Sequence, residues 1–528
     1  MRTRMYRNIS SSVLVGLLAL LVLQFTVLSA VAAPHSSSPD FAHIDAYVSS
    51  EMQANHLPGL ALGIVHGTTI AHLHGFGTAD QAGRAVTPQT PFILGSTSKS
   101  FTALAIMQLV EAGKVDLDAP VQRYLPWFRV ADPSASTRIT VHQLLYQTSG
   151  IPGTTSVENK MYVNDTGNET LEQFVRDLST VTLDRPVGTS FEYANPNYSV
   201  LGLIVQVVSG QSYESYIQQH IFVPLQMQNS FASKQNAMRD GLAQGYRWWF
   251  GAPLPNDLPY YQTILPAGFL ISSAEDMSHY LVAQMNGGQF TNASVLSSKG
   301  IAIMHAPGVT IDAAGGGYGM GWEYVSPREN DTGGPLYLHN GETTGNFHSE
   351  MLIEAAPQWG IILLTNIGDS KVFKGVQQGI IRGIADMLIG HEPADAGLRA
   401  STVYLIIDGL LGVISILVLV SAARLPHWYK KFPQRKHKVL RLGLRLVWEL
   451  VLPLALLIGL TIPGSGAKES WPQLLLALPD LGWWLLITLV VVLLTGIIRA
   501  ILAFRVLRQK RTDIRMEVPT PNASPSLT

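Results

Sequence analysis

The sequence predicts an α/β domain followed by an α-helical membrane region. The domain is expected to hold an antiparallel sheet formed by both of its ends, flanked by helices, with an inserted helical lobe. Strand-like apolar runs stand near both ends of residues 34–390, whereas the middle carries mostly helical patterns. Three long apolar runs after residue 400 predict the membrane region.

Composition narrows the class of protein. Of 528 residues, 47% are hydrophobic and 14% are charged, and a low charged fraction is typical of chains with membrane segments. There is no cysteine, which excludes a disulfide framework and a thiolate metal site. Residues 34–400 carry 18 basic and 31 acidic residues, a net charge of about −13. Such a surface repels polyanions, so we expect no nucleic-acid partner.

Residues 1–33 have the features of an export signal. Arg2, Arg4 and Arg7 precede an apolar run over residues 13–31, which ends in Ala30-Val31-Ala32. A charged region, an apolar region and an A-x-A site predict a secretory signal peptide, or an uncleaved signal anchor. Either interpretation places the following domain outside the cytoplasm.

The elements of the domain, residues 34–390, follow from periodicity. A helix is predicted over residues 41–53, then strands over 60–65 and 69–76. Strands over 350–353 and 360–365 and a helix over 376–389 close the domain. Helical patterns between them cover residues 141–146, 171–178, 198–208 and 274–285.

A polar linker, residues 391–402, leads to region 403–503, in which we predict three transmembrane helices. Their spans, about 403–422, 446–462 and 481–503, are each near the roughly 20 residues that cross a bilayer.

Basic residues cluster between the first two spans and in the tail, residues 504–528, whereas the loop over 463–480 has Lys468 as its one base. The positive-inside rule puts both basic segments in the cytoplasm and residue 400 outside. We therefore predict a multi-pass protein of the cell membrane, partnered by the lipid bilayer, with the domain of residues 34–390 extracytoplasmic. Asp408 and Glu449 lie inside spans, near span ends, where acids are rare.

The chemistry begins in residues 91–113, which read as a strand end, a turn at Gly95 and a helix with Ser96 and Lys99 on its first turn. Residues three apart on a helix are neighbours, so the Lys99 ammonium is expected beside the Ser96 hydroxyl. A serine needs such a base or cation to become a nucleophile. The four-residue pattern is common by chance, so further motifs must support it.

Two further motifs follow: Tyr193-x-Asn195, about one hundred residues after Ser96, and His339-Asn340-Gly341 before a strand. This ordered set resembles the serine β-lactamase-related family, which includes class C β-lactamases and low-molecular-weight penicillin-binding proteins. The resemblance extends over about residues 40–370, and S-x-x-K in such enzymes marks the nucleophilic serine with its lysine.

The resemblance implies roles for each motif. Ser96 would attack a carbonyl and form an acyl-enzyme, while Lys99 and Tyr193 share the proton transfer. Tyrosine has an unperturbed pKa near 10, so a basic Tyr193 needs stabilisation as phenolate by the neighbouring lysine. Asn195 would orient Lys99 and bind a substrate amide.

The third motif is implied to bind substrate through His339 and Gly341. The oxyanion hole would take the backbone N–H groups of Ser96 and Glu342, and Gly341 lets its strand approach closely. Relatives often carry lysine where this chain has His339. An imidazole with an unperturbed pKa near 6.5 is about a quarter charged at neutral pH, so weaker capture of substrate carboxylates is expected.

Two smaller departures affect the expected shape of the pocket. Gln147 stands where the family often has histidine, and Ala267-Gly268-Phe269 has one of two usual glycines.

The sequence thus predicts a membrane-anchored, extracytoplasmic serine hydrolase acting on small peptide, amide or ester substrates, such as D-Ala-D-Ala peptides, β-lactams or esters. No cofactor and no metal are expected: His72 and His74 alternate along one strand, but no third ligand is expected near them. The alternative is a sensor or binding module that acylates without efficient turnover. The short tail after the last span favours plain anchoring, and a transporter is disfavoured because most of the chain lies outside the spans.

Overall fold

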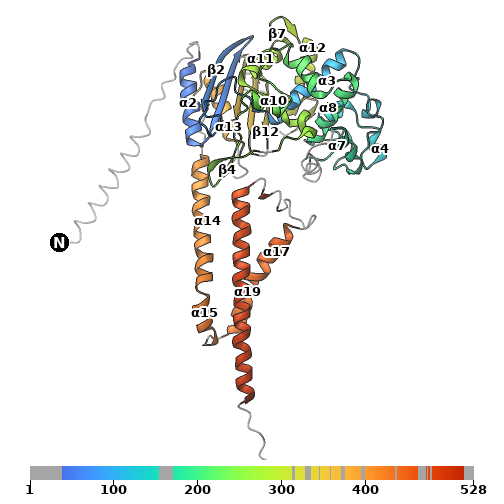
Figure 1. Ribbon diagram of the computed structural model, residues 1–528. Coiled ribbons are helices and arrows are strands. Elements are labelled where there is room, and N and C mark those ends of the chain that lie inside the picture. Colours follow the sequence, from blue (N-terminus) through green and yellow to red (C-terminus); the bar gives the residue numbers. More distant parts are fainter. Residues whose placement is uncertain are drawn as a thin grey trace, which may run out of the picture.

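In the computed structural model of the chain, a sheet covered by helices is followed by long apolar helices (Figure 1). The residues that it describes are 39–153, 171–257, 259–311, 315–326, 334–343, 345–356, 358–369, 375–393, 399–434, 437–461, 471, 474–475 and 478–516. The predicted signal, residues 1–33, therefore lies outside the described residues.

An eight-stranded antiparallel sheet forms the centre of the domain. Its strands, in spatial order, are β2 (Thr69–Gly77), β1 (Gly59–His66), β14 (Trp359–Thr365), β13 (His348–Glu354), β12 (Leu336–Glu342), β11 (Glu323–Val325), β10 (Gly317–Tyr318) and β9 (Val309–Thr310). Strand β1 pairs with β14, with Leu60 opposite Thr365. The predicted sheet, formed by both ends of the domain, is confirmed.

Two cores lie on opposite faces of this sheet, because successive side chains of a strand point to opposite sides. Leu60, Leu62 and Ile64 of β1 belong to the core under the helices α2 (Phe41–Ala54) and α13 (Val376–Leu388). Ala61 and Val65 belong to the larger core, which also contains α3 (Ser98–Glu111), α8 (Asn195–Ser209) and α11 (Ala274–Met285). Figure 1 shows α2 on one side of the sheet and α3 and α8 on the other.

The helical lobe lies between β2 and β9 in the sequence. The four helices predicted over residues 141–146, 171–178, 198–208 and 274–285 are present with bounds within three residues of the prediction, whereas the helices Pro133–Ser136, Tyr213–Ile217, Lys234–Arg239 and Ser298–His305 were not predicted. Helix α8 runs through its centre, with ten of its residues buried, and ends at Gly210, whose φ of +72° suits glycine. The remaining elements of the lobe are β3 (Phe92–Ile93), α4 (Pro133–Ser136), α5 (Val141–Leu145), α7 (Leu171–Asp177), α9 (Tyr213–Ile217), α10 (Lys234–Arg239), β4 (Tyr246–Trp249), β5 (Ala252–Pro255), β6 (Ile271–Ser272), β7 (Gln289–Phe290), β8 (Ala293–Ser294) and α12 (Ser298–His305).

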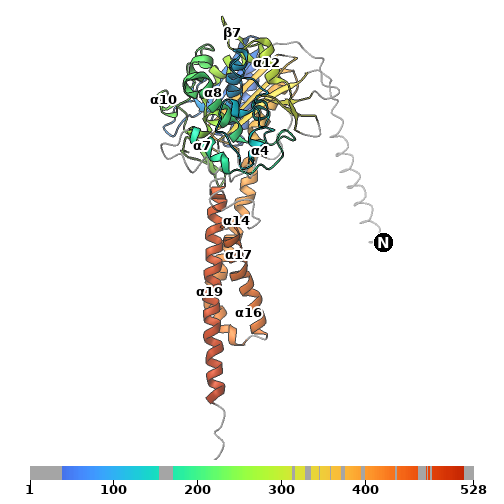
Figure 2. The same ribbon diagram turned by 90° about the vertical axis from the view of Figure 1, so that its right-hand side faces the viewer.

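Three helices in the described part of the chain are long and apolar enough to cross a membrane. They are Ala400–Ala423 (α14), Lys438–Gly459 and the first part of α19 (Pro479–Met516). The second consists of α16 (Lys438–Leu446), the π-helical turn η8 (Val447–Val451) and α17 (Leu452–Gly459), and α15 (Leu425–Lys431) precedes it. All three extend from the same end of the domain (Figures 1 and 2).

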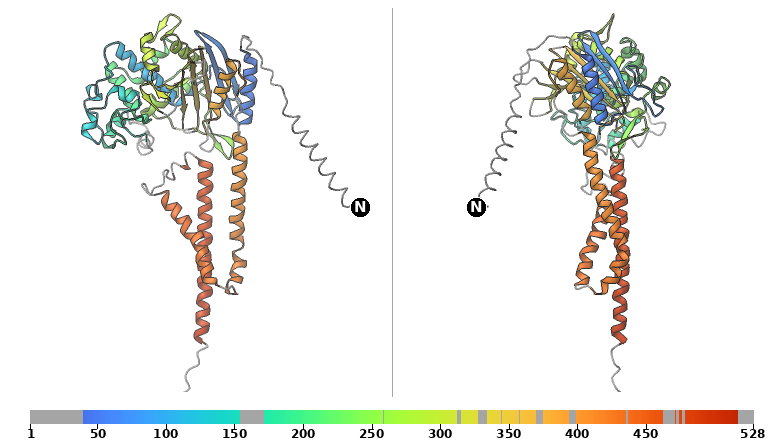
Figure 3. Two further views of the ribbon diagram at one scale, coloured as in Figure 1. Left: turned by 180° about the vertical axis from the view of Figure 1, so that it is seen from behind. Right: turned by 90° about the vertical axis from the view of Figure 1, so that its left-hand side faces the viewer.

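The first apolar helix begins at Ala400, three residues before the predicted boundary, because the domain caps it. The N–H of Ala400 donates to Oδ1 of Asn55 at 3.0 Å, just beyond the end of α2. Tyr404, 3% exposed, stacks on Trp248 of the β4–β5 hairpin at 5.7 Å between ring centroids. Helix α14 therefore packs directly against the domain, beneath α2 (Figure 3).

An ion-pair cluster joins the second and third apolar helices. Glu449 accepts from Nε of Arg445 at 2.9 Å and from Nε of Arg499 at 2.7 Å, and Arg499 is fully buried. Glu449 therefore pairs with one cation four residues earlier on its own helix and with one on the neighbouring helix α19. Helix α19 continues to Met516, beyond the predicted start of the tail at residue 504, because arginine and lysine are good helix formers.

Candidate active site

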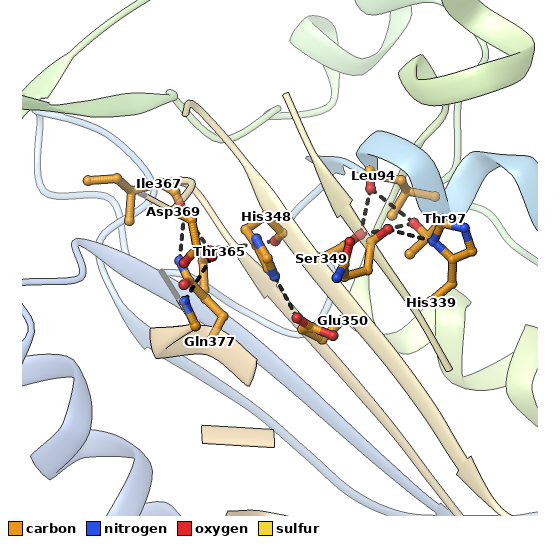
Figure 4. Close-up of polar contacts among 12 residues, drawn as sticks. Leu94, Thr97, His339, His348, Ser349, Glu350, Thr365, Ile367, Asp369 and Gln377 are labelled. Atoms are coloured by element: carbon orange, nitrogen blue, oxygen red, sulfur yellow. Dashed lines mark hydrogen bonds and ion pairs between the residues drawn. The ribbon is translucent and has the colours of Figure 1, made fainter. Parts of the chain in front are cut away.

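Ser96 lies in the turn Gly95–Thr97, a 3₁₀ turn that runs directly into α3. Gly95 has a φ of +58°, in the left-handed region that favours glycine. Thr97 fixes the turn, because its hydroxyl donates to the carbonyl of Leu94 at 3.0 Å and lies 3.0 Å from Oγ of Ser349 on β13 (Figure 4). Ser96 therefore lies in the 3₁₀ turn that precedes α3, and not on the first turn of the α-helix as predicted.

Lys99 lies beside Ser96 and is completely buried. Its ammonium donates to Oγ of Ser96 at 2.9 Å, to Oδ1 of Asn195 at 2.7 Å and to the carbonyl of Ala267 at 2.7 Å. A lysine ammonium has three donors, and these three acceptors match them. A buried cation is tolerated when it is hydrogen-bonded in this way.

Tyr193 is brought to the same point from the segment before α8. The Lys99 Nζ lies 4.7 Å from the centroid of the Tyr193 ring and 5.7 Å from that of Tyr198. Because Nζ also contacts Ser96 and Asn195, the serine, lysine, tyrosine and asparagine of the first two motifs meet in one place. Their meeting joins α3 to the start of α8.

Gln147 holds the tyrosine segment in place. It is fully buried and has a φ of +59°, which is unusual for a residue with a side chain. Its Oε1 accepts from the N–H of Ala194 at 3.1 Å, and its carbonyl accepts from the N–H of Glu192 at 2.8 Å. Tyr193 is therefore fixed from both sides by one residue. The sequence identifies Gln147 as a departure from the histidine that the family often has, but its contacts with the Tyr193 segment are visible only in the tertiary structure.

His339 lies on β12 and is 1% exposed. Its Nδ1 donates to the carbonyl of Asn340 at 2.6 Å, which leaves Nε2 to accept from the hydroxyl of Tyr318 at 3.3 Å. Burial and the neighbouring Lys99 cation lower the pKa of His339 to about 3, against the opposing hydrogen bond to Asn340. The expectation of a partly charged imidazole at neutral pH is therefore wrong, because no solvent remains around the ring to stabilise the charge.

Gly341 lets β12 touch the nucleophile turn. A Cβ on Gly341 would lie 2.0 Å from the carbonyl oxygen of Leu94 and 2.7 Å from the backbone nitrogen of Ser96. A Cβ on Gly95 would lie 2.4 Å from the backbone nitrogen of Glu342. The two glycines thus bring together the backbone nitrogens of Ser96 and Glu342, the pair predicted to form an oxyanion hole.

Comparison with known families agrees with this arrangement. The family model described as β-lactamase matches residues 44–381, which is more than half of the chain. The chain belongs to the β-lactamase family. Its domain therefore has the fold of the serine β-lactamases and penicillin-binding proteins.

Individual proteins that resemble this β-lactamase-family chain include penicillin-binding proteins. Protein flp of Staphylococcus aureus (strain MW2) is 29% identical over 335 residues, which cover 63% of this chain and 64% of that protein. Penicillin-binding protein 4 of Amycolatopsis lactamdurans is 30% identical over 346 residues, covering 63% of this chain and 87% of that protein. The octameric penicillin-binding protein homologue from Pyrococcus abyssi superposes with a TM-score of 0.58 at 29% identity, covering 67% of this chain and 78% of that one. The match spans less than two thirds of the length of Protein flp.

A cavity of about 290 Å³ lies beside the site of this β-lactamase-family domain. Phe269 and Thr343 line it, and they stand next to the Ala267 segment and to Glu342 in the chain. Its wall also carries Lys234, which pairs with Asp257 at 2.6 Å. Its size approaches that of small-molecule pockets.

The expectation that no third ligand lies near His72 and His74 is wrong. His72 and His74 do have a third potential ligand, because Asp45 of α2 lies 2.8 Å from His72 Nε2 and 2.6 Å from His74 Nδ1. Asp45 is 27 residues from His72 and 29 from His74 in the chain, and it reaches both histidines because α2 packs on β2, so local sequence patterns do not indicate it.

Proposed function

We propose that the chain is a membrane-anchored serine hydrolase that forms an acyl-enzyme on Ser96. The observation that carries this proposal is the Lys99 ammonium, buried and bonded to Ser96 Oγ at 2.9 Å beside the Tyr193 ring. Membership of the β-lactamase family supports it, as does the match to penicillin-binding protein 4. The catalytic residues are Ser96, Lys99 and Tyr193.

The proton transfer follows from the donors and acceptors. Lys99 directs its three protons to three acceptors, so the ammonium form suits its surroundings and is a poor base. Tyr193, as phenolate stabilised by that cation, takes the proton of Ser96 while Oγ bonds to the substrate carbonyl carbon. The phenol then returns the proton to the departing amine or alcohol. In the second half of the reaction, Tyr193 takes a proton from water while the water oxygen bonds to the acyl carbon. The bond to Ser96 Oγ then breaks, Tyr193 returns the proton to Oγ, and the acid product leaves.

The negative charge that develops on the carbonyl oxygen is assigned to the N–H groups of Ser96 and Glu342. Asn195 orients Lys99, and Gly341 allows the substrate to lie against β12. Loss of one oxyanion donor typically costs about 10²–10³ in rate.

The substrates are small peptide, amide or ester compounds. A neutral His339 supplies no cation for a substrate carboxylate, so the third motif favours substrates without one at that position. The predicted signal and the basic loops support a domain outside the cytoplasm, and the three apolar helices are long enough to anchor it.

The test is to incubate the purified full chain in detergent with a fluorescent penicillin and, separately, a fluorescent fluorophosphonate, and to follow the gain and loss of label. Ser96→Ala removes the nucleophile, and Ser50→Ala, an exposed serine of α2, is the matched control. Label that depends on Ser96, with penicillin lost again as product accumulates, supports a hydrolase. A lasting penicillin adduct supports the sensor instead. Labelling that survives in Ser96→Ala refutes both.

A further inference from the structure

Three potential metal ligands lie where three neighbouring strands end. Glu342 is the last residue of β12 and pairs in register with His348, the first residue of β13. His348 also pairs with Thr365, the last residue of β14, and Asp369 follows four residues later. One ligand atom from each of Glu342, His348 and Asp369 lies within 4.8 Å of the others. Figure 4 shows His348 and Asp369 together at this end of the sheet.

His348 is held as metal-binding histidines usually are. It is 4% exposed, and its Nε2 lies 2.8 Å from Oε1 of Glu350, which is 2% exposed. A carboxylate accepts, so Nε2 carries the proton and Nδ1 of a neutral ring carries a lone pair. Among the described residues this buried Nδ1 has no hydrogen-bond partner. A ligating histidine typically donates its other N–H to a carboxylate in this manner.

Asp369 presents a second buried lone pair. Its Oδ2 accepts from the N–H of Gly375 at 3.0 Å, which fixes the carboxylate. Its Oδ1 is buried and has no hydrogen-bond partner in the described part of the chain. Buried polar atoms are normally satisfied, and each exception calls for an explanation such as a bound ion.

The charge around His348 favours a cation. The carboxyl groups of Glu350, Asp369 and Glu342 lie around its imidazole. These three carboxylates and one imidazole have a net negative charge whether or not the ring is protonated.

We propose that Glu342, His348 and Asp369 bind a divalent ion of the zinc class, with Glu350 orienting the histidine. Bond lengths of about 2.0–2.2 Å to nitrogen and oxygen place tetrahedral ligand atoms about 3.4 Å apart, within the observed spread. Three protein ligands leave a coordination position for water. Mg²⁺ and Ca²⁺ prefer six or more oxygen ligands, so they bind less tightly to this set.

The consequence for catalysis rests on the proposed function, whereas the binding does not. The backbone N–H of Glu342 is assigned to the oxyanion hole, and Ser349, next to His348, contacts the nucleophile turn. An ion on the Glu342 side chain would fix the end of β12 against Ser96.

The test measures Zn²⁺ binding to the full chain, purified in detergent without a histidine tag, stripped with a chelator and titrated at pH 7.5 against a chromophoric chelator. We expect one Zn²⁺ per chain at this site. Glu350→Gln should weaken binding about 10- to 100-fold, the usual effect of losing a residue that orients a ligand, and Asp369→Asn at least as much. Asp45→Asn alters the other histidine cluster and should leave this affinity unchanged.

Thermal unfolding with and without Zn²⁺ provides the second readout. Zn²⁺ should raise the Tm of the wild type and of Asp45→Asn, but not that of Asp369→Asn. If Asp369→Asn does not fold, Glu342→Gln decides, because that side chain is exposed and its loss should weaken binding without unfolding the domain.

Absence of stoichiometric Zn²⁺ binding, unchanged binding in Asp369→Asn or Glu342→Gln, or loss of the bound ion in Asp45→Asn would overturn the proposal. Ser96 labelling is measured on the same samples. Loss of labelling with Zn²⁺ binding intact would reject the hydrolase and leave the metal site standing.

Discussion

The hydrogen bond between Asn195 and Lys99 allows a quantitative prediction. Lys99 is fully buried, and its ammonium donates to Oδ1 of Asn195 at 2.7 Å. Asn195→Ala removes that acceptor, whereas Ser96 Oγ and the Ala267 carbonyl still accept from the ammonium. Hydrogen bonds to charged groups contribute about 1.5–3 kcal/mol, which corresponds to a rate loss of about 10- to 150-fold if the bond is needed in the transition state.

The assay is the second-order rate of labelling by fluorescent penicillin, together with kcat/KM for a neutral p-nitrophenyl ester. Ser96→Ala gives the background, and Asn236→Ala, an exposed asparagine of α10, is the matched control. Asn195→Asp retains an oxygen acceptor and should recover part of the loss, because the carboxylate still orients the ammonium.

Labelling of Asn195→Ala at the wild-type rate, with Ser96→Ala inactive, would refute this reasoning. Such a result would mean that the remaining acceptors orient Lys99 without Asn195. Equal losses in Asn195→Ala and Asn195→Asp would point instead to a direct contact between the amide N–H₂ and the substrate.

Four further outcomes are expected. Gly341→Ala should lower kcat for the ester about 10²–10³-fold, because the new Cβ would lie 2.0 Å from the Leu94 carbonyl oxygen and displace an oxyanion donor. Gly379→Ala is the control, because open space surrounds that position, and its kcat should be unchanged. The ratio of activities on carboxylate-bearing and neutral substrates should stay flat from pH 5 to 8, since His339, with a pKa of about 3, is neutral throughout; a fall in that ratio with rising pH would contradict this. Its unfolded-state pKa is near 6.5, so its share of stability is complete above pH 6.5 and is lost as the pH falls toward 3, which unfolding curves against pH would detect. Glu449→Gln should destabilise the apolar helices by about 3–5 kcal/mol, because the buried Arg499 loses the carboxylate with which it pairs. Thermal unfolding in detergent measures this loss, and Arg445→Gln should have a smaller effect because Arg445 is half-exposed.

Local patterns in the sequence determined much of the fold. The apolar runs of β1 and β14 and the apolar length of residues 403–422 depend on side chains close together in the chain, so they can be read directly. The neighbourhood of Ser96 and Lys99 is local as well, because three residues of helical backbone bring the two together whatever surrounds them. The ends of the helices were less predictable: α14 begins at Ala400 because Asn55, 345 residues earlier, caps it.

The tertiary structure alone decided the charge of His339, the support of Tyr193 by Gln147, and the clusters around Asp45 and His348. Each depends on which distant segments meet and on how much water they exclude. Burial moved the His339 pKa to about 3, and no property of a single residue in the sequence carries that information. Residue types and spacing therefore determined which groups can react, whereas packing determined their protonation and their partners.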